Sequence, residues 1–239
     1  MLSENELQRY RRQLDIPDWG EEGQMKLKEA SVVVAGAGGL GSAALTYLAV
    51  AGLGNIRVID NDKVELSNLN RQILHTDQNI GQFKVDSARQ RLQVLNPEIK
   101  IETITDALSE KNVLDLVEGR PIIDALDNLE GRLLLNRASL KQKTPLFHGA
   151  VYGFEGRATT LIPGQTPCLQ CMYQGTLSGE FPVPGITPGI IGCIQATEVI
   201  KYVLGIGALL LGRIVVYDGL NMRFSEIKLK RNPTCEACK

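Results

Sequence analysis

Apolar residues in the first 145 positions alternate between two patterns, which predicts strands alternating with helices. Short apolar runs typical of strands occur at 31–36, 55–60, 99–105 and 120–127. Apolar residues at helical spacing occur at 40–52, 81–96, 109–119 and 129–143, with Ser109 expected to cap the third of these helices. This alternation favours an α/β fold, a Rossmann-like sheet whose strands are parallel in this half, with helices on both faces.

The pattern changes after Pro145. The stretch PLFHGAVYGFEGRATTLIP (145–163) predicts two paired strands, and two more are expected at 213–218 and 222–231, joined by a hairpin-like GLN turn. Residues 163–189 are rich in proline and glycine, so they are expected to form one long loop before a helix at 190–205. The sheet is therefore predicted to be mixed, with antiparallel strands at its C-terminal end.

Composition narrows the class of protein. The chain has 239 residues, of which 44% are hydrophobic, so it can bury a sizeable core. A net charge of −1 argues against a nucleic-acid partner, which normally selects a strongly basic surface. The polar, helix-like N-terminus lacks a signal-peptide core, and no apolar run suits a bilayer, so we expect a cytoplasmic protein without a membrane contact.

A glycine motif follows the first strand. Gly36, Gly38 and Gly41 form G-x-G-x-x-G between a predicted strand and a predicted helix, and Gly39 lies within it. Glycines allow close backbone approach, and the helix N-terminus offers free N–H groups to phosphate. Asp60 ends the next strand, 22 residues after Gly38, where a carboxylate can bind ribose hydroxyls. The alternative is a tight turn with a surface aspartate.

Four residues that follow indicate which nucleotide is bound. Asn68 and Arg71 lie just beyond the second strand, Lys84 falls near a helix start, and Asp127 ends a predicted strand at the same sheet edge. Each alone is compatible with a solvated surface charge, and a dinucleotide cofactor is the default for the glycine motif. Two cations and an isolated carboxylate together favour a triphosphate with Mg²⁺ over a nicotinamide cofactor.

The cysteines form two pairs. Cys168 and Cys171 make one C-x-x-C, Cys235 and Cys238 another, with 63 residues between the pairs. Four thiolates at this spacing favour a closed, structural Zn²⁺ site that would hold the tail to the proline- and glycine-rich loop. A redox pair or an iron–sulfur cluster is the alternative. Cys193 starts an apolar helix and is expected to be a small buried residue.

These features together resemble the ThiF/MoeB/HesA family, adenylyltransferases related to ubiquitin-activating enzymes. The resemblance is carried by RYRRQL (9–14), GAGGLG, DNDKVELSNLNRQ, GQFKVDSA, DALDN, both C-x-x-C pairs and the RNPTCEAC end. It implies that ATP with Mg²⁺ adenylates the C-terminal glycine of a ubiquitin-like sulfur-carrier protein ending in Gly-Gly. It also implies one adenylating domain over 1–239, with a helical arm (1–30), a nucleotide-binding half (31–145) and a half that binds carrier and zinc (146–239).

The resemblance assigns roles to individual residues. Asp60 would hold the ribose, the glycine loop would hold the phosphates, and Asp127 would position Mg²⁺. Three side chains would contact the phosphates: Asn68, Arg71 and Lys84. Arg12 matches an arginine that reaches into a partner subunit's active site, which implies a homodimer. The four paired cysteines match the family's zinc ligands.

The chemistry needs no side-chain nucleophile, because the carrier's carboxylate is already ionised when it attacks the α-phosphorus. His75 and His148 are then not required as catalysts, and His148 is expected to be packed or hydrogen-bonded. Some family members carry a cysteine before the last helix that forms a thioester or persulfide, whereas YQGTLSGEFPVPGITPGI (173–190) has none. We therefore expect adenylation without a thioester and a separate sulfurtransferase, with a molybdopterin-type or general sulfur-carrier role favoured over a thiamin role.

Three other functions explain part of the sequence. An NAD-dependent oxidoreductase would account for the glycine motif and Asp60, but not for Arg71, Lys84 or the cysteine pairs. A non-catalytic subunit would bind the carrier without adenylating it, and would not need the cationic set. A related ATP-dependent enzyme acting on a modified tRNA base fits poorly with the near-neutral charge.

Overall fold

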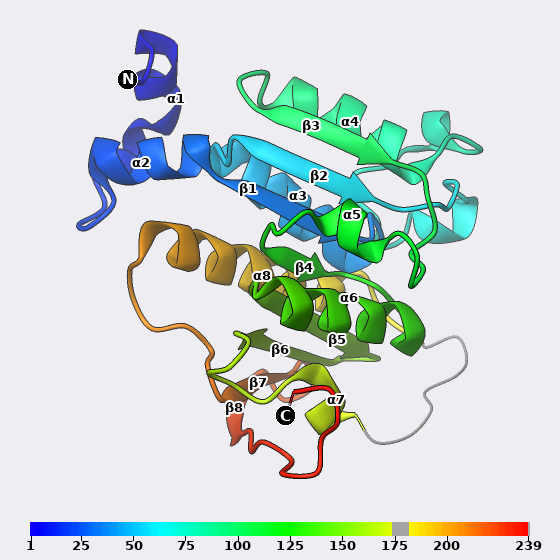
Figure 1. Cartoon of the computed structure of the whole chain (residues 1–239). Helices are drawn as coiled ribbons and strands as arrows, with labels where there is room; N and C mark the ends of the chain where they lie inside the picture. Colours follow the sequence, from blue (N-terminus) through cyan, green and yellow to red (C-terminus); the bar gives the residue numbers. More distant parts are fainter. Residues whose placement is uncertain (174–181, 239) are drawn as a thin grey trace.

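One mixed sheet organises the molecule (Figure 1). The computed structural model describes residues 1–173 and 182–238, and its eight strands lie in the order β3-β2-β1-β4-β5-β6-β7-β8. The first five strands in this order are parallel, and the pairs from β5 to β8 are antiparallel. The strands are β1 (Ser31–Ala35), β2 (Asn55–Ile59), β3 (Lys100–Ile104), β4 (Ile122–Asp124), β5 (Leu146–Tyr152), β6 (Glu155–Leu161), β7 (Arg213–Asp218) and β8 (Arg223–Lys228). The predicted mixed sheet is confirmed.

The central strands are apolar on both sides because helices cover both faces of the sheet. In β1, Val32 and Val34 belong to one core cluster, whereas Val33 and Ala35 belong to the other. Successive side chains of a strand point to opposite faces, so a strand buried on both faces reads as a continuous apolar run. This explains why the sequence shows runs rather than alternation in the parallel half.

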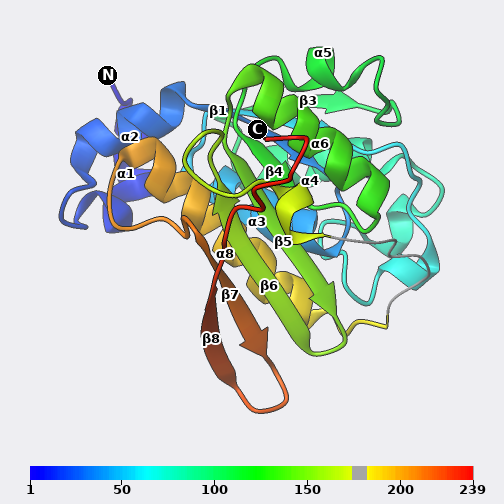
Figure 2. The ribbon, with the colours of Figure 1, turned by 60° about the horizontal axis from the view of Figure 1, so that its bottom comes forward.

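The helices form two layers around the sheet (Figures 1 and 2). The first core cluster packs under α3 (Gly39–Ala51), α4 (Lys84–Leu95) and α8 (Ile186–Leu204), and the second under α5 (Val113–Val117) and α6 (Leu129–Gln142). Two 3-10 turns, η1 (Leu66–Asn68) and η2 (Asp77–Asn79), lie between β2 and α4. No helix in the described part of the chain is long and apolar enough to span a bilayer.

Two helices lie within the first thirty residues and are held against the rest of the protein. They are α1 (Glu4–Leu14), which starts with a Ser3–Glu6 capping box, and α2 (Gly20–Glu29). Tyr10 is 3% exposed, and its hydroxyl accepts a 2.8 Å hydrogen bond from Asn96 Nδ2. A Cβ built on Gly52, at the C-terminal end of α3, would lie 2.6 Å from the Tyr10 hydroxyl. This contact holds α1 at that end of α3.

The third predicted helix is much shorter than expected, and its expected cap is wrong. Residues 109–112 form a turn in which Asn112 Oδ1 accepts from both the backbone N–H and the hydroxyl of Ser109, at 2.8 and 2.9 Å. Asn112, not Ser109, precedes the first residue of α5, Val113. The second predicted helix also begins later, at Lys84 rather than at residue 81.

The strand predicted at 120–127 covers only Ile122–Asp124, so Asp127 does not end it. Asp124 ends β4, and its Oδ1 accepts a 3.2 Å hydrogen bond from the N–H of Leu126. A carboxylate that bonds the backbone two residues ahead turns the chain out of the strand. Asp127 therefore lies in the loop that leads to α6.

The expectation of one irregular loop over 163–189 is wrong. The described part of this stretch contains a short helix, α7 (Leu169–Met172), and the start of α8, which begins at Ile186 rather than at 190. Pro188 lies in the first turn of α8, where the missing N–H costs nothing because first-turn N–H groups have no intrahelical partner. Residues 174–181 lie outside the described part of the chain.

Helices α3 and α8 approach each other closely at Gly192. A Cβ built there would lie 2.3 Å from the carbonyl oxygen of Leu40 and 2.9 Å from Cβ of Ala43. Gly189, one turn earlier in α8, has nothing within 4 Å of its built Cβ. The helices therefore touch through Gly192, and Gly189 is sterically free.

We predict opposite effects of alanine at these two glycines. Gly192→Ala should lower the free energy of unfolding by about 1–3 kcal/mol, because the added methyl group pushes α3 and α8 apart. Gly189→Ala should raise it by up to about 1 kcal/mol, because alanine is the better helix former. Urea unfolding of both variants checks this, and equal effects would contradict the proposed helix contact.

Candidate nucleotide site and four-cysteine cluster

The loop between β1 and α3 needs glycine at two positions for different reasons. Gly36 has a φ of +101°, and its built Cβ would lie 2.6 Å from the carbonyl oxygen of Ala125. At Gly41 a Cβ would lie 1.9 Å from the carbonyl oxygen of Gly36, so α3 approaches the loop too closely for a side chain. Gly38 precedes α3 and borders open space, with only Gln72 Nε2 at 3.7 Å from its built Cβ. The first N–H groups of α3 have no intrahelical partner, and anions bind at helix N-termini of this kind.

Asp60 lies beside this loop, as its position in the sequence predicts. Its Oδ2 accepts a 2.7 Å hydrogen bond from the N–H of Ala37, and its Oδ1 accepts a 2.9 Å bond from the N–H of Asp62. Burial raises the pKa of Asp60, and the charge of Lys84 opposes that rise. The structure therefore brings the Asp60 carboxylate to the glycine loop and fixes its orientation.

Lys84 is the first residue of α4, and its side chain is 8% exposed. Its Nζ lies 2.7 Å from Oδ2 of Asp62, a carboxylate that the sequence reasoning did not single out. A lysine at a helix N-terminus is disfavoured by the helix dipole, so a nearby anion is needed there. In the protein alone Asp62 provides it, and a phosphate would provide a second one.

Asn68 and Arg71 lie in and after η1. Asn68 is buried and its Oδ1 accepts from the N–H of Glu65 at 3.1 Å, which holds the turn. Arg71 Nη1 donates to the carbonyl oxygen of Ser67 at 2.9 Å, and its Cγ lies 3.5 Å from the Cβ built on Gly39. The structure thus places Arg71 against the glycine loop.

Gln72 was missed by the sequence reasoning. It is 4% exposed, its Nε2 faces Gly38, and its Oε1 is among the buried oxygens that find no partner in the described residues. A buried amide oxygen without a partner is costly, so it needs a hydrogen-bond donor that the described residues do not supply, such as a water molecule or a bound group. Only its position directly after Arg71 could have drawn attention to it.

Asp127 is exposed in the β4–α6 loop, and its one recorded contact is a 3.5 Å bond from Asn128 Nδ2. The same loop borders the glycine loop, because Gly36 meets Ala125. The structure therefore brings the Asp127 loop and Asp60 to one edge of the sheet, while the Asp127 carboxylate itself faces solvent.

Arg12 lies far from this edge within its own chain. It is exposed on α1, which is held at the C-terminal end of α3 through the contact of Tyr10 with Gly52. The glycine loop lies at the other end of α3, which has 13 residues and therefore spans about 20 Å. The structure does not bring Arg12 to the glycine loop of the same chain.

Both histidines are buried, and each of their ring nitrogens has a hydrogen-bond partner. His148 Nδ1 lies 2.6 Å from Oδ2 of Asp124, and its Nε2 lies 3.1 Å from the Tyr173 hydroxyl. His75 Nδ1 lies 2.8 Å from Ser87 Oγ, and its Nε2 lies 3.1 Å from the carbonyl oxygen of Ala37. Burial lowers the pKa of each histidine. The expectation that His148 is a hydrogen-bonded core residue is confirmed.

The four paired cysteines converge on one point. Their sulfur atoms all lie within 4.8 Å of one another, with Sγ–Sγ distances of 3.9 Å (Cys168–Cys171), 3.7 Å (Cys168–Cys235) and 3.5 Å (Cys171–Cys238). A disulfide would need about 2.05 Å. Tetrahedral Zn²⁺ with Zn–S bonds of about 2.3 Å requires sulfur atoms about 3.8 Å apart, so the donor set fits zinc.

The electrostatics of the cluster also call for a cation. Burial, together with the hydrogen bonds among the neighbouring thiols, raises the pKa of Cys238 to about 12. Four thiolates this close are stable only with a metal ion between them. The cluster joins α7 to the C-terminal tail, which lies beside α7 and α6 in both views (Figures 1 and 2). It is thus placed to hold the end of the chain.

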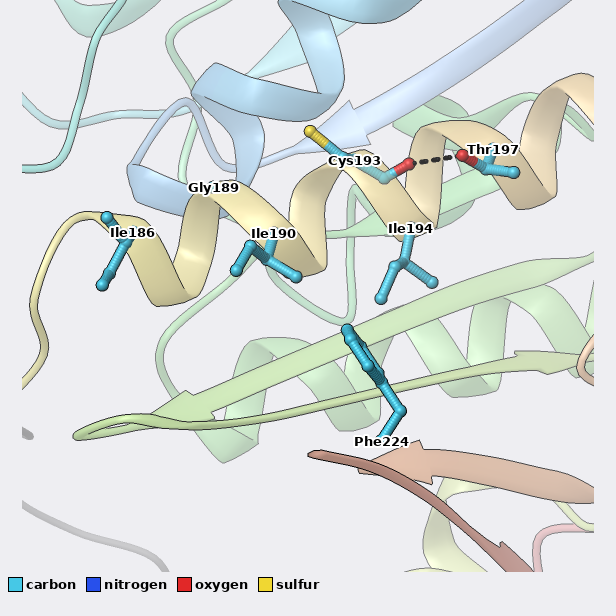
Figure 3. A pocket seen from close by; sticks show the side chains of 7 residues that line it. All are labelled: Ile186, Gly189, Ile190, Cys193, Ile194, Thr197 and Phe224. Atoms are coloured by element: carbon cyan, nitrogen blue, oxygen red, sulfur yellow. Dashed lines mark hydrogen bonds between the residues drawn. The ribbon is translucent and has the colours of Figure 1, made fainter. Parts of the chain in front are cut away.

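A separate apolar groove of about 570 Å³ runs between α8 and β8. Figure 3 shows Ile190 and Ile194 pointing from α8 toward Phe224 of β8. Cys193 lines the same groove and is half-buried, so the expectation that it is a buried residue is only partly met. Burial raises the pKa of Cys193, which makes its thiol a weak nucleophile.

Comparison with known proteins relates this arrangement to one family. A protein-family model described as the ThiF family matches residues 10–237. The chain is 41% identical to the "SAMP-activating enzyme E1" of Haloferax volcanii, over 99% of this chain and 90% of that protein. It is 40% identical to the "Sulfur carrier protein adenylyltransferase" of Thermus thermophilus, over 99% of this chain and 92% of that protein.

Other matches are longer or more distant proteins. The chain is 42% identical to the "Adenylyltransferase and sulfurtransferase MOCS3" of Culex quinquefasciatus, over 99% of this chain but 56% of that protein. A crystal structure of E. coli MccB with ATP superposes with a TM-score of 0.80 at 23% identity, covering 91% of this chain and 68% of that one. The PaaA crystal structure superposes with a TM-score of 0.83 at 24% identity, covering 95% and 75%. These two likenesses show a shared fold.

We predict that Cys238→Ser lowers the zinc content of the purified protein and its melting temperature, because one ligand of the cluster is lost. A loss of about 2–3 kcal/mol would lower the melting temperature by about 5–10 °C for a chain of this size. Elemental analysis and calorimetry measure both quantities. Cys193→Ser, outside the cluster, is the matched control and should keep its zinc. An unchanged zinc content in Cys238→Ser would contradict the assignment.

Proposed function

The chain belongs to the ThiF family, and from this membership we propose that it is an ATP-dependent adenylyltransferase of a ubiquitin-like sulfur-carrier protein. The observation that carries the proposal is about 40% identity, over 99% of the chain, to an enzyme named sulfur carrier protein adenylyltransferase. The site supports it, because an anion-binding helix N-terminus, two cations and two carboxylates meet at one sheet edge.

The reaction joins the carrier to AMP. An oxygen of the carrier's C-terminal glycine carboxylate attacks the α-phosphorus of ATP, the bond to the β-phosphate oxygen breaks, and pyrophosphate leaves with the electron pair. The attacking carboxylate is already ionised, so no side chain has to remove a proton. The protein must hold two anions in line and offset the charge that develops on the phosphates.

We assign these tasks to the residues gathered at the glycine loop. Asp60, oriented by the N–H of Ala37, would bind the ribose, and the free N–H groups at the start of α3 would bind phosphate oxygens. Arg71 and Lys84 would contact the phosphates beside them, with Asn68 holding the turn that carries Arg71. Asp127, an exposed carboxylate on the neighbouring loop, suits Mg²⁺, which when bound neutralises phosphate charge.

The four-cysteine cluster has a structural task in this proposal. Cys168, Cys171, Cys235 and Cys238 would fill all four ligand positions of a tetrahedral ion, which would leave no place for substrate. Unpaired thiols at these distances also suit a reducing compartment, so we place the enzyme in the cytoplasm. The sulfur chemistry is then carried by another group.

We propose that this group belongs to a separate sulfurtransferase. The MOCS3 relatives are named for both activities, and the chain spans 56% of the first of them. The stretch 173–190 falls partly on residues outside the described part of the chain, and its sequence contains no cysteine for a thioester. The acyl-adenylate would therefore be released to, or used by, the second enzyme.

The competing functions lose support from the whole-chain comparison. An NAD-dependent oxidoreductase or an enzyme of tRNA bases would not require full-length identity to adenylyltransferases. A non-catalytic carrier-binding subunit remains the alternative, and the next experiment separates it from an enzyme.

We expect ATP–pyrophosphate exchange with a carrier ending in Gly-Gly, and a loss of at least about 100-fold in Asp127→Ala, because the metal-binding carboxylate is removed. The melting temperature should stay unchanged, since Asp127 is exposed. Asp115→Ala, an exposed aspartate on α5, is the control and should exchange like the unaltered protein. Absence of exchange with every carrier would support the non-catalytic alternative.

We further propose a homodimer in which Arg12 serves the partner's site. Arg12 and the glycine loop lie at opposite ends of α3, so a two-fold axis that packs α3 and α8 antiparallel on a second copy brings them together. The apolar groove of Ile190, Ile194 and Phe224 on α8 and β8 supplies a surface for that contact.

Mixing two inactive variants tests this arrangement. Arg12→Ala and Asp127→Ala should each be inactive, but subunit exchange between them creates heterodimers with one intact site. Activity should then recover to about a quarter of the unaltered level in an equimolar mixture. Sedimentation confirms the dimer in each sample. No recovery from mixed dimers would show that Arg12 does not act across the interface.

A further inference from the structure

His75 is a buried side chain that the adenylation chemistry does not use. It is 5% exposed and lies in the segment between η1 and η2. Its Nε2 lies 3.1 Å from the carbonyl oxygen of Ala37, which can only accept a hydrogen bond. The Nε2 atom must therefore carry the proton and donate. In the neutral ring Nδ1 then accepts, from the Ser87 hydroxyl at 2.8 Å.

Ala37 is the middle residue of the turn Gly36–Ala37–Gly38, and both of its polar backbone atoms are held by side chains. Its N–H donates to Asp60, and its carbonyl oxygen accepts from His75. Because the peptide group is planar and trans, fixing the Ala37 carbonyl fixes the N–H of Gly38 in the opposite direction. Within residues 1–173 and 182–238, that Gly38 N–H has no hydrogen-bond partner. It is a donor left free for a ligand.

The second contact of His75 leads to the other anion-binding element. Ser87 lies in the first turn of α4, three residues after Lys84, and is 1% exposed. The hydrogen bonds from His75 to Ala37 and to Ser87 therefore connect the glycine loop to α4, the helix that carries Lys84. Burial first, and the charge of Lys84 in addition, lower the pKa of His75, so the ring stays neutral at physiological pH.

We propose that His75 is a positioning residue for the nucleotide polyphosphate: it orients the Gly38 N–H and sets the distance between the glycine loop and Lys84. This inference rests on the proposed function, because it assumes that the loop binds the phosphates of ATP. His75 touches neither ATP nor the carrier, so it acts through Ala37 and Ser87.

The test compares two variants of His75 in pyrophosphate exchange. His75→Leu removes both hydrogen bonds and should raise the KM for ATP at least tenfold, while the KM for the carrier protein stays within twofold. His75→Gln carries an amide N–H that reaches the Ala37 carbonyl, and should restore the KM for ATP to within threefold of the unaltered protein. A purely structural role would lower the melting temperature of both variants without this split between the two KM values.

A serine pair supplies the matched control and covers the case in which His75→Leu does not fold. Ser87→Ala removes the hydroxyl that fixes the His75 tautomer, and should raise the KM for ATP severalfold. Ser139 is also a buried serine in a helix, α6, and its hydroxyl donates to the carbonyl oxygen of Thr144 at 2.6 Å. Ser139→Ala should leave the KM for ATP unchanged.

The outcomes distinguish a failure of the positioning role of His75 from a failure of the proposed function. If the unaltered protein binds ATP but Ser87→Ala or folded His75→Leu keeps the same KM for ATP, the positioning role of His75 is overturned and the proposed function stands. The role is also overturned if Ser139→Ala shifts the KM as much as Ser87→Ala. If the unaltered protein binds no ATP by calorimetry, the proposed function falls and the inference falls with it.

Discussion

The contact between β1 and α3 is the constraint on which the site depends. α3 starts so close to the strand that a side chain at Gly41 would overlap the Gly36 carbonyl, with a built Cβ 1.9 Å away. This approach places the free N–H groups of α3 at the carboxyl edge of the sheet, level with Asp60 and the loop after β4. Moving α3 outward to admit a side chain would also open its contact with α8 at Gly192, where the backbones again meet without a Cβ. Two glycine contacts thus fix one helix between the sheet and its neighbour.

The four-cysteine cluster lies between α7 and the C-terminal tail, where little regular structure holds the chain. Within residues 163–173 and 182–185, the one-turn helix α7 is the regular element that precedes α8, and the described residues 229–238 after β8 form none. Leu169 is fully buried in the second core cluster, and its N–H donates to Asn136 Oδ1 on α6 at 2.9 Å. A metal on Cys168 and Cys171 would extend this fixed point to Cys235 and Cys238. Its binding energy would then stabilise a tail that buries little apolar core of its own.

The sequence predicted those parts of the site whose residues lie at a fixed spacing along the chain. The glycine motif, Asp60 and the two cysteine pairs each have a fixed spacing, and the structure brings each group to the expected place. Asp62, Gln72 and His75 were not predicted, because their contacts depend on how the segment between β2 and α4 folds back on the glycine loop. The apolar run at 120–127 predicted too long a strand, because nothing in the run shows that Asp124 accepts a hydrogen bond from the N–H of Leu126 and ends the strand. The start of α8 was hidden by Pro188, which reads as a loop residue yet is tolerated in a first helical turn.

The length of α3 separates Arg12 from the glycine loop of the same chain. The N-terminal end carries the glycine loop, while the C-terminal end is capped by Gly52 and packed under Tyr10 of α1. A charge on α1 therefore lies about a helix length from the glycine loop of its own chain, which is farther than an arginine side chain reaches. Antiparallel packing on a second copy turns this separation into proximity, because it places the C-terminal end of one α3 beside the N-terminal end of the other. In the proposed dimer, the rigid length of α3 would place an arginine on α1 beside the partner's glycine loop instead of its own.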